Sequence, residues 1–259
     1  MTARILIKIG GRAFEGREGF VSLAEAIRVA DRAQFIIVHG GGGEISEALR
    51  KANRDTAFVD GIRVTLAEDI QIVEDVLSGR INKRIAAFLS ENGVSCRRLS
   101  GKTDHIFIVE PLIRHGRSLG YVGEIKDVNA RPVLDSLERG CVPVVSPISS
   151  DREGNSYNVN ADSAAAALAV ASQSSDLIYL SDVPGVCMKN IILPSLTIEE
   201  ARKLVADGTI KGGMVAKIES ACEALESHVN RVHITQWHGR DTLANIVKKA
   251  PTPGTIIQL

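Results

Sequence analysis

Two spacings of apolar residues alternate along this chain and predict strands and helices in turn. Short apolar runs, typical of strands buried on both faces, are followed by stretches in which apolar residues recur three and four positions apart, as on one face of a helix. The predicted strands cover residues 5–9, 35–39, 95–99, 106–110, 142–146, 177–180, 232–235 and 255–258. The predicted helices cover residues 21–33, 44–52, 66–77, 81–91, 130–139, 161–171, 198–207, 212–227 and 242–248.

This order of elements predicts an α/β fold, in which helices sandwich a mainly parallel sheet. Antiparallel hairpin insertions are expected at 58–65, 119–128 and 151–160, the first with its turn at Asp60-Gly61. A weak boundary falls near residue 172. We therefore expect two lobes, residues 1–172 and 173–259, that share one continuous central sheet.

The composition narrows the possible functions. The 259 residues include 31 Lys and Arg against 31 Asp and Glu, and only 4% are aromatic, so no surface for nucleic acid is expected. The longest apolar run, 164–171, is too short to cross a membrane. The four cysteines lie far apart without a C-x-x-C pair. This indicates reduced thiols, a cytoplasmic protein and no metal site of its own.

Lys8 is the first candidate for chemistry, because it lies inside an apolar strand directly before Gly10-Gly11. A buried cation is costly unless an anion meets it, and glycines expose backbone N–H groups. The next strand likewise ends at His39 and leads through Gly40 to Gly43 into a helix. A tight turn explains one or two of these glycines. The full run favours an anion held by amides and a helix N-terminus.

Two familiar phosphate-binding motifs are absent. The stretch Ser100 to Thr103 resembles the end of a P-loop, but Cys96 stands where the first glycine of G-x-x-x-x-G-K-[ST] belongs. No G-x-G-x-x-G follows a predicted strand, so a dinucleotide fingerprint is missing as well. A phosphate site in this chain must therefore be of another kind.

Three further residues could serve an anionic site. Asp162 lies at the start of an alanine-rich helix, and either Asn160 or Asp162 could cap that helix, or Asp162 could hold a lysine still. The run of alanines also implies that something bulky approaches this helix closely. Lys217 lies one helical turn after Gly212-Gly213, although a lone helical lysine is usually a solvated surface group. Arg63, in the first hairpin, could bind a carboxylate through its planar fork, and a surface ion pair is its ordinary alternative.

Taken in order, seven stretches resemble the amino acid kinase family, and within it the N-acetylglutamate kinases. They span nearly the whole chain, and those at 60–65 and 158–162 are the most specific. The stretches are Ile7 to Gly11, Val38 to Gly42, Val59 to Thr65, Leu119 to Glu124, Asn158 to Asp162, Leu180 to Val186 and Gly208 to Lys217. The resemblance implies the family's α/β/α fold, with residues 1–172 as the amino-acid-substrate lobe and residues 173–259 as the nucleotide-binding lobe.

The resemblance also implies an activity: ATP-dependent phosphorylation of the side-chain carboxylate of N-acetyl-L-glutamate to an acyl phosphate, in arginine biosynthesis. Mg²⁺ would be carried by the nucleotide. Lys8 and Lys217 would stabilise the phosphoryl group in transit, and Asp162 would orient both lysines. The substrate would be bound by Gly41, Gly42, Arg63 and Asn158. The nucleotide would be bound by Gly10, Gly11, Asp182, Val183, Pro184, Gly185, Val186, Thr209, Ile210 and Lys211.

The chemistry agrees with these roles. A carboxylate that attacks the γ-phosphorus of ATP meets strong repulsion, so the protein's main tasks are in-line positioning and neutralisation of charge. Positioning and charge neutralisation can both come from lysines, glycine amides, helix N-termini and Mg²⁺, and no covalent intermediate is needed. The carboxylate is already ionised at neutral pH and needs no general base. Asp162 is therefore better interpreted as the residue that orients the two lysines than as a general base.

Two alternatives stay open at this point. The chain could phosphorylate another acyl-amino acid, either N-succinylglutamate or a carrier-linked aminoadipate or glutamate; a longer acidic acyl group would require an additional cation. It could instead be a catalytically silent relative that binds ATP or an amino acid and regulates a partner. The joint presence of Lys8, Asp162 and Lys217 argues against this. The short segment before Lys8 further predicts a homodimer, without the interlacing N-terminal helix of arginine-inhibited relatives.

Overall fold

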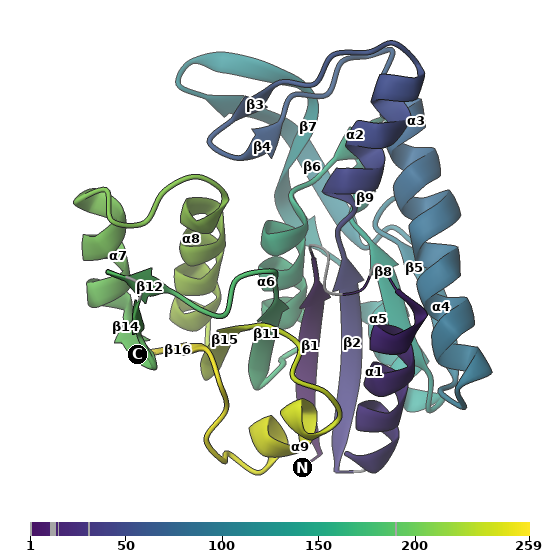
Figure 1. Cartoon of the computed structure of the whole chain (residues 1–259). Helices are drawn as coiled ribbons and strands as arrows, with labels where there is room; N and C mark the ends of the chain where they lie inside the picture. The colour runs from purple at the N-terminus through teal and green to yellow at the C-terminus, as the bar shows by residue number, and fades with distance from the viewer. Residues whose placement is uncertain (1, 11–13, 15, 31, 190) are drawn as a thin grey trace.

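An eight-stranded sheet forms the centre of the molecule (Figure 1). The computed structural model describes residues 2–259 apart from 11–13, 15, 31 and 190. The strands from β15 to β5 are parallel, whereas β16 runs antiparallel to β15, so the predicted α/β fold with a mainly parallel sheet is confirmed. Across the sheet the order is β14 (Ser195–Thr197), β16 (Thr255–Gln258), β15 (Arg231–Thr235), β11 (Asp176–Leu180), β1 (Ala3–Ile9), β2 (Ala33–His39), β8 (Val142–Ser146) and β5 (Cys96–Ser100).

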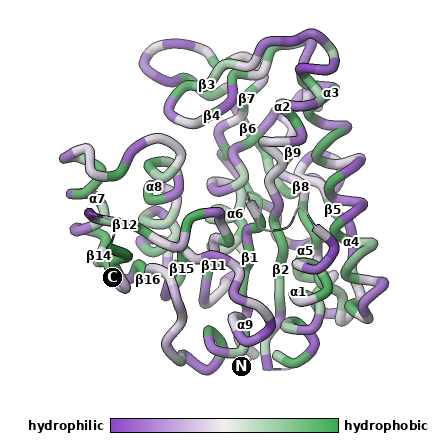
Figure 2. Tube along the Cα trace, viewed as in Figure 1, coloured by the Kyte–Doolittle hydropathy of each residue, from purple (hydrophilic) through white to green (hydrophobic). Residues whose placement is uncertain are grey.

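Helices cover both faces of this sheet and form two separate apolar layers. Because side chains of a strand alternate between faces, Ile5 and Ile7 of β1 pack on one layer and Leu6 packs on the other. Figure 2 shows the hydrophobic stretches concentrated in the central strands. The layer of Ile5 contains α1 (Arg17–Val29), α2 (Gly42–Lys51), α4 (Asn82–Glu91) and α9 (Asp241–Val247); the layer of Leu6 contains α5 (Arg131–Glu138), α6 (Ala161–Ala171), α7 (Ile198–Ala206) and α8 (Gly213–Glu226).

Helix α6 packs closely on the sheet because most of its side chains are small. Ala164 and Ala165 are fully buried, and α6 contacts both β1 and α8. The alanine-rich sequence predicted that something bulky approaches this helix. The protein's own strands and α8 occupy that place, and they bring α6 and α8 together at the side of β1 that Lys8 faces.

Antiparallel insertions stand beyond the carboxyl ends of the parallel strands (Figure 1). The turn between β3 and β4 has positive φ at both Asp60 (50°) and Gly61 (79°), as a two-residue hairpin requires, so this predicted hairpin is confirmed. Four of the strands close into a small barrel in the order β10, β7, β6 and β9. The bounds are β3 (Phe58–Val59), β4 (Ile62–Arg63), β6 (Phe107–Arg114), β7 (Arg117–Val128), β9 (Ile148–Ser150) and β10 (Ser156–Asn158).

The structure differs from the predicted elements in three places. The hairpin expected at 119–128 is wrong, because these residues lie in one continuous strand, β7, which pairs with β6. The helices expected at 66–77 and 81–91 are joined, because α3 (Ile70–Glu74) continues through π-helical turns at Asp75–Ile81 directly into α4. The short strands β12 (Cys187–Met188), β13 (Ile191–Ile192) and β14 were not predicted. Strands of two or three residues are too short to show a periodic pattern.

Replacement of Leu168 by alanine should test the layer around α6. Leu168 is fully buried, so Leu168→Ala should lower the free energy of unfolding by about 2–5 kcal/mol. Leu66 is 46% exposed, and Leu66→Ala should cost less than about 1 kcal/mol. Urea denaturation of both variants measures the difference. Equal losses in the two variants would contradict the assigned core.

Candidate functional site

Two lysines and one aspartate, far apart in sequence, meet near the carboxyl end of β1. Lys8 Nζ lies 2.9 Å from Oδ1 of Asp162, and Lys217 Nζ donates a hydrogen bond of 2.9 Å to Oδ2 of the same carboxylate. The contact of Lys8 is an ion pair without hydrogen-bond geometry. All three residues are buried, with 6–9% of their surface exposed. The structure thus brings together the three residues that the sequence singled out as catalytic candidates.

Two contacts hold Asp162 in place. Asn160 caps α6, because its side-chain oxygen accepts hydrogen bonds from the backbone N–H groups of Asp162 (2.8 Å) and Ser163 (3.2 Å). Tyr179, fully buried on β11, donates from its hydroxyl to the carbonyl oxygen of Asp162 at 3.2 Å. The ammonium of Lys217 also lies 4.6 Å from the centre of the Tyr179 ring. Asn160 therefore serves as the cap, and the Asp162 carboxylate is left for the lysines.

Burial and charge shift the pKa of Asp162 in opposite directions. Burial by itself would raise the pKa of this carboxyl group, but the charges of Lys8 and Lys217 outweigh it and lower the pKa to about 2. Burial lowers the pKa of the Lys217 ammonium, and the charge of Asp162 opposes that shift. The cluster is one carboxylate between two ammonium groups, so an excess of positive charge faces the adjoining space.

Glycines at the ends of β1 and β2 make room beside this cluster. A Cβ atom on Gly10 would displace the Lys8 ammonium group from its place next to Asp162. The N–H of Gly10 donates to Leu180 O at 3.1 Å, and the N–H of Gly40 donates to Ile9 O at 2.9 Å. These bonds tie together the ends of β11, β1 and β2. Gly11, also expected to bind the nucleotide, lies outside the described residues.

Helix α2 begins directly after the glycine turn of β2. Gly41 is its N-cap and makes no side-chain cap hydrogen bond, so the N–H groups of the first turn have no partner within the helix. A Cβ atom on Gly42 or Gly43 would meet nothing within 4 Å, which shows that the space in front of these residues is open. Free amides and the positive end of the helix dipole suit an anion at this position.

A buried histidine, to which the sequence assigned no role, orients the glycine turn. His39 Nδ1 lies 3.1 Å from Gly40 O, which can only accept, so Nδ1 carries the proton. His39 Nε2 then accepts from Asn82 Nδ2 at 3.2 Å, and the same Nδ2 donates to Val144 O at 2.8 Å. Burial lowers the pKa of His39 to about 4, so the imidazole is neutral at pH 7. A polar residue at the start of a helix is ordinary, and for this reason Asn82 gave no signal in the sequence.

A cavity of about 240 Å³ opens beside the cluster and contains an unsatisfied guanidinium. Arg63 Nη2 donates to Gly42 O and to Ser46 Oγ, both at 2.8 Å, and the guanidinium lies 4.7 Å from the centre of the Phe58 ring. Arg63 Nη1 is buried and has no hydrogen-bond partner among the described residues. A buried N–H group without a partner is costly, so Nη1 marks a place for an anionic group.

Asn158 lines the same cavity from β10. Its Nδ2 donates to Thr65 Oγ1 at 3.1 Å, which fixes the orientation of the amide and leaves the carbonyl oxygen available. Of the four substrate-binding residues expected from the sequence, Gly41, Gly42, Arg63 and Asn158, all line this cavity. The remaining described lining residues are Lys8, Gly10, Gly40, Ile45, Phe58, Gly61, Ile62, Leu77, Val122, Pro147, Val159, Asn160, Ala161 and Asp162.

The hairpin of β3 and β4 reaches the helix that carries Lys217. A Cβ atom on Gly61 would lie only 3.0 Å from Gly213 Cα. Gly212, the N-cap of α8, has φ 61° and ψ −140°, a conformation that favours glycine. Glycines on both sides therefore permit a close contact that bounds one side of the cavity.

The residues expected to bind a nucleotide follow β11 or precede α8. Asp182 lines a second cavity, of about 790 Å³, together with Gly10 and the glycine turn of β2. Val186 and Ile210 are buried, and their N–H groups already donate to Thr255 Oγ1 and Leu204 O at 2.8 Å each. The others lie at the same edge of the sheet: Val183, Thr209 and Lys211 are exposed, Pro184 is partly buried and Gly185 is buried.

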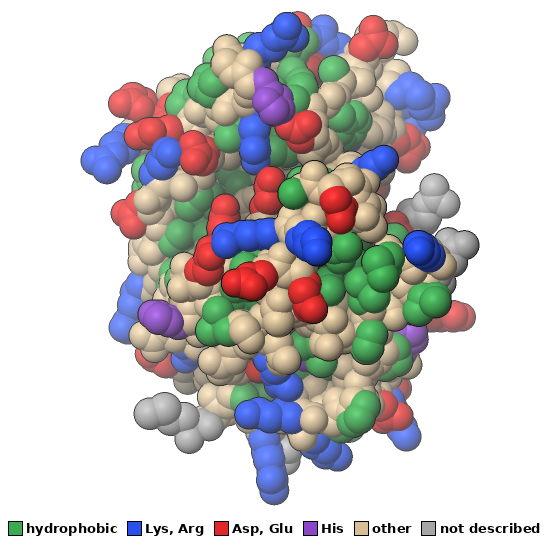
Figure 3. All heavy atoms as spheres, turned by 90° about the vertical axis from the view of Figure 1, so that its left-hand side faces the viewer, with side chains coloured by type: hydrophobic (Ala, Val, Ile, Leu, Met, Phe, Trp, Pro, Cys, Tyr) green, Lys and Arg blue, Asp and Glu red, His purple; other side chains and the backbone are tan. Residues whose placement is uncertain are grey.

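A further hollow adjoins this site and shares Ile62, Val159 and Asn160 with the cavity of about 240 Å³. It measures about 1010 Å³ and lies between the β6–β7 hairpin and helices α6, α7 and α8, and none of Lys8, Asp162 and Lys217 lines it. Arg114 and Glu219 approach each other to 3.6 Å beside it, and Figure 3 shows acidic and basic side chains interspersed on this face of the molecule. Such mixed charge gives the hollow no preference for an anion.

The described part of the chain holds no group of three or more His, Cys, Asp and Glu residues close enough together to bind a metal ion. Among the described residues that line the cavity of about 240 Å³, Asp162 is the only acid, and two lysines share it. Within the same described residues, no helix is long and apolar enough to cross a membrane.

Comparisons with known proteins agree with this geometry. The model of the amino acid kinase family matches residues 3–236. The acetylglutamate kinase of Geobacillus kaustophilus is 36% identical over 250 residues (92% of this chain and 96% of that protein), and that of Carboxydothermus hydrogenoformans is 40% identical over 249 residues (89% and 83%). The solved structure of smu.665 from Streptococcus mutans UA159 is 29% identical, with a TM-score of 0.86 over 100% of this chain and 99% of the other. The chain belongs to the amino acid kinase family.

Proposed function

We propose that this chain transfers the γ-phosphoryl group of ATP to the side-chain carboxylate of N-acetyl-L-glutamate, in arginine biosynthesis. The buried cluster of Lys8, Asp162 and Lys217 carries the proposal, because it sets an excess of positive charge beside a small cavity that contains an unsatisfied guanidinium. The similarity to acetylglutamate kinases, at 34–40% identity, supports the same activity. A catalytically silent relative would have no need for two lysines held in contact with one aspartate.

The transfer forms a bond from a carboxylate oxygen to the γ-phosphorus and breaks the bond to the β–γ bridging oxygen. The products are an acyl phosphate and ADP. Lys8 and Lys217 neutralise the negative charge that two anionic reactants bring together, and the amides of Gly41 and Gly42 add hydrogen-bond donors. Asp162 holds both ammonium groups in fixed positions. The attacking carboxylate is ionised at neutral pH, so no side chain has to accept a proton.

ATP is the phosphoryl donor of this family, and Mg²⁺ enters with it. Asp162, the one acid among the described lining residues of the small cavity, is engaged by two lysines, so Mg²⁺ would be held by phosphate oxygens and water rather than by these residues. It would neutralise phosphate charge. We assign nucleotide binding to Gly10, Gly11, residues 182–186 and residues 209–211, with residues 173–259 as the nucleotide lobe and residues 1–172 as the substrate lobe.

The cations around the cavity favour an uncharged acyl group on the substrate. Among its described lining residues, the cations are Lys8 and Arg63. Lys8 faces the reacting carboxylate, and the guanidinium of Arg63, with the remaining N–H of the Asn158 amide, is placed to hold the α-carboxylate. Among the described lining residues, no further cation is left for a second carboxylate on the acyl group. N-acetylglutamate therefore fits this cavity better than N-succinylglutamate.

A homodimer in the cytoplasm, insensitive to arginine, stays a prediction from the sequence. The chemistry proposed for the cavity uses residues of one chain and does not depend on the oligomeric state.

An assay of ADP release over a panel of acylated amino acids tests the proposed function. We expect N-acetyl-L-glutamate to give the highest kcat/KM, and N-succinyl-L-glutamate a value at least about tenfold lower, because the described lining residues offer no further cation for its second carboxylate. Trapping with hydroxylamine identifies the acyl phosphate. If no member of the panel releases ADP faster than ATP alone, the proposal is wrong. A preference for the succinyl compound would replace the acetyl assignment.

Removal of either ammonium group should slow the reaction. We expect Lys8→Ala and Lys217→Ala each to lower kcat by about 10²–10³-fold or more, by analogy with the loss of one donor from an oxyanion hole. Lys51→Ala, which removes a surface lysine paired with Glu47, is the control and should retain normal kcat. Steady-state kinetics with circular dichroism as a check of folding measures the effect. A near-normal kcat would remove that lysine from the mechanism.

Replacement of Asp162 by asparagine should separate catalysis from substrate binding. Asp162→Asn keeps the size of the side chain but leaves the two lysines without a counter-charge, so kcat should fall by more than KM for the acylated amino acid rises. Steady-state kinetics at saturating ATP measures both. A larger effect on KM than on kcat would contradict an organising role.

The same variant should show the lowered pKa of Asp162 as a change in acid stability. A folded-state pKa of about 2, below the ordinary value of 3.8, adds stability that is present above pH 4 and is lost as the pH falls toward 2. Between these pH values the free energy of unfolding of the parent should fall by about 2 kcal/mol more than that of Asp162→Asn. Urea denaturation as a function of pH measures it. Parallel curves would contradict the ion-pair assignment.

A further inference from the structure

Lys102, in the stretch that resembles the end of a P-loop, has no part in the mechanism above. Its loop has no room for a phosphate group, because a Cβ atom on Gly101 would lie 2.6 Å from Ile148 O. The N–H of Gly101 also already donates to Ser146 O at 3.0 Å. The loop amides that a P-loop would offer to phosphate are thus packed inward, and Lys102 must serve a different purpose.

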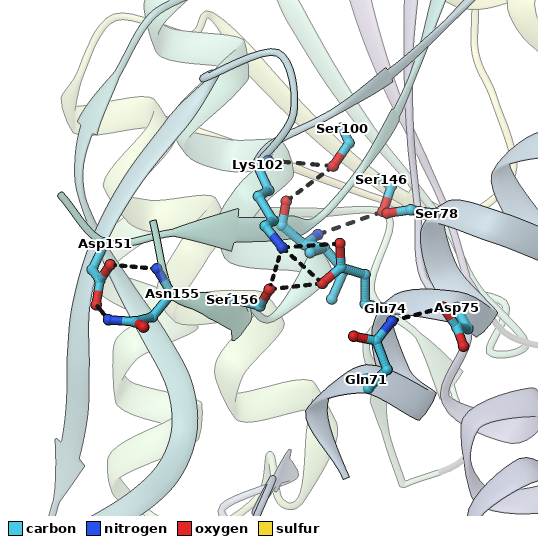
Figure 4. Close-up of polar contacts among 11 residues, drawn as sticks. Gln71, Glu74, Asp75, Ser78, Ser100, Lys102, Ser146, Asp151, Asn155 and Ser156 are labelled. Atoms are coloured by element: carbon cyan, nitrogen blue, oxygen red, sulfur yellow. Dashed lines mark hydrogen bonds and ion pairs between the residues drawn. The ribbon is translucent and has the colours of Figure 1, made fainter. Parts of the chain in front are cut away.

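The Lys102 side chain joins a carboxylate and a hydroxyl from two other elements (Figure 4). Lys102 Nζ lies 3.2 Å from both carboxylate oxygens of Glu74 and 2.6 Å from Ser156 Oγ. Ser156 Oγ in turn donates to Glu74 Oε2 at 2.7 Å. Each of the three side chains contacts the other two, so the group closes into a triangle. We call these three residues the Lys102 clamp.

The clamp joins two segments that each contribute a wall residue to the substrate cavity. Glu74 is the last residue of α3, and the π-helical turns that follow it carry Leu77. Ser156 begins β10, which carries Asn158 two residues later on the same face of the strand. Leu77 and Asn158 both line the cavity of about 240 Å³. The distance between these wall residues therefore depends on the contacts of Lys102.

A second contact beside the clamp supports this arrangement. Ser78 Oγ, one residue after Leu77, lies 2.7 Å from Ser146 Oγ at the end of β8 (Figure 4). The next residue of the chain, Pro147, lines the cavity as well. The π-helical turns are thus held from two sides, by Lys102 through Glu74 and by β8 through Ser146.

The burial of the clamp distinguishes it from a surface ion pair. The side chains of Lys102 and Glu74 are 30% and 19% exposed, whereas those of Lys51 and Glu47, an ion pair on α2, are 68% and 54% exposed. Ion pairs on the surface contribute little because water screens them, and less exposed pairs that share a further hydrogen bond are held more firmly. Lys51 and Glu47 therefore provide a matched control.

We propose that Lys102, Glu74 and Ser156 are positioning residues that set the width of the substrate cavity and thereby the affinity for the acylated amino acid. The inference rests on the proposed function for its substrate. The phosphoryl-transfer cluster has supports beyond the clamp, because Asn160 and Tyr179 fix Asp162. Loss of the clamp should therefore raise KM for the acylated amino acid and leave kcat and KM for ATP nearly unchanged.

Steady-state kinetics of clamp variants test this inference. We expect Lys102→Met to raise KM for N-acetyl-L-glutamate about tenfold, and Lys102→Arg, which keeps a cation for Glu74, to raise it less than about threefold. Glu74→Gln combined with Lys102→Met should have little more effect than Lys102→Met alone, because the two residues act as one unit. Lys51→Met is the control and should leave KM unchanged. Ser156→Ala, a milder change, replaces Lys102→Met if that variant does not fold.

Hydrogen exchange of backbone amides tests the clamp without relying on enzymatic activity. It therefore shows whether the clamp inference or the proposed function is wrong. Without substrate, Lys102→Met should speed the exchange of backbone amides in residues 148–158, and Lys51→Met should not. A KM within twofold of the parent together with unchanged exchange would overturn the inference, as would equal changes in kcat and in both KM values. An inactive parent with faster exchange in Lys102→Met would refute the proposed function and retain the clamp.

Discussion

The ion pairs of Lys8 and Lys217 with a single buried carboxylate are the interaction on which the site depends. Removal of three charged groups from water is costly, and only their mutual attraction at close distance offsets it. One carboxylate cannot neutralise two ammonium groups, so the cluster is balanced only when a further anion joins it. The neutral state of His39 adds no charge to this balance. The residues of this site therefore carry a net positive charge, which favours binding of the anionic reactants of phosphoryl transfer.

The parallel sheet explains why residues so distant in sequence form this cluster. The carboxyl ends of parallel strands lie at the same edge of the sheet, and ligands of such sheets bind at that edge. Lys8 reaches that edge on β1, while α6 and α8 pack on the same face of the sheet and bring Asp162 and Lys217 to it. The backbone hydrogen bonds of Gly10 and Gly40 to neighbouring strand ends keep this edge rigid. Small side chains on α6 are necessary for the whole arrangement, because larger ones would keep the helix away from β1.

The antiparallel insertions add what the sheet lacks, namely the walls of a cavity and a selective cation. Arg63 comes from the β3–β4 hairpin and Asn158 from β10, and neither belongs to the central sheet. In the proposed function, chemistry and selection are divided between two parts of the fold: the sheet edge would gather charge for the phosphoryl group, and the insertions would shape the space for the acyl group. The Lys102 clamp lies where the insertion that carries Asn158 meets the helix beneath the cavity.

The sequence by itself determined the order of strands and helices, the parallel sheet and the identity of the charged residues at its edge. Periodicity and the chemistry of glycine are local properties, so Lys8 before Gly10 could be interpreted without a structure. The tertiary structure alone decided that Asn160 and not Asp162 caps α6, that two predicted helices are joined by π-helical turns, and that His39 and Asn82 orient the glycine turn. It also decided that one nitrogen of Arg63 is left without a partner and that Lys102 pairs with Glu74. These features depend on contacts between residues distant in the chain, whose geometry is set by packing in three dimensions and leaves no pattern in the local sequence.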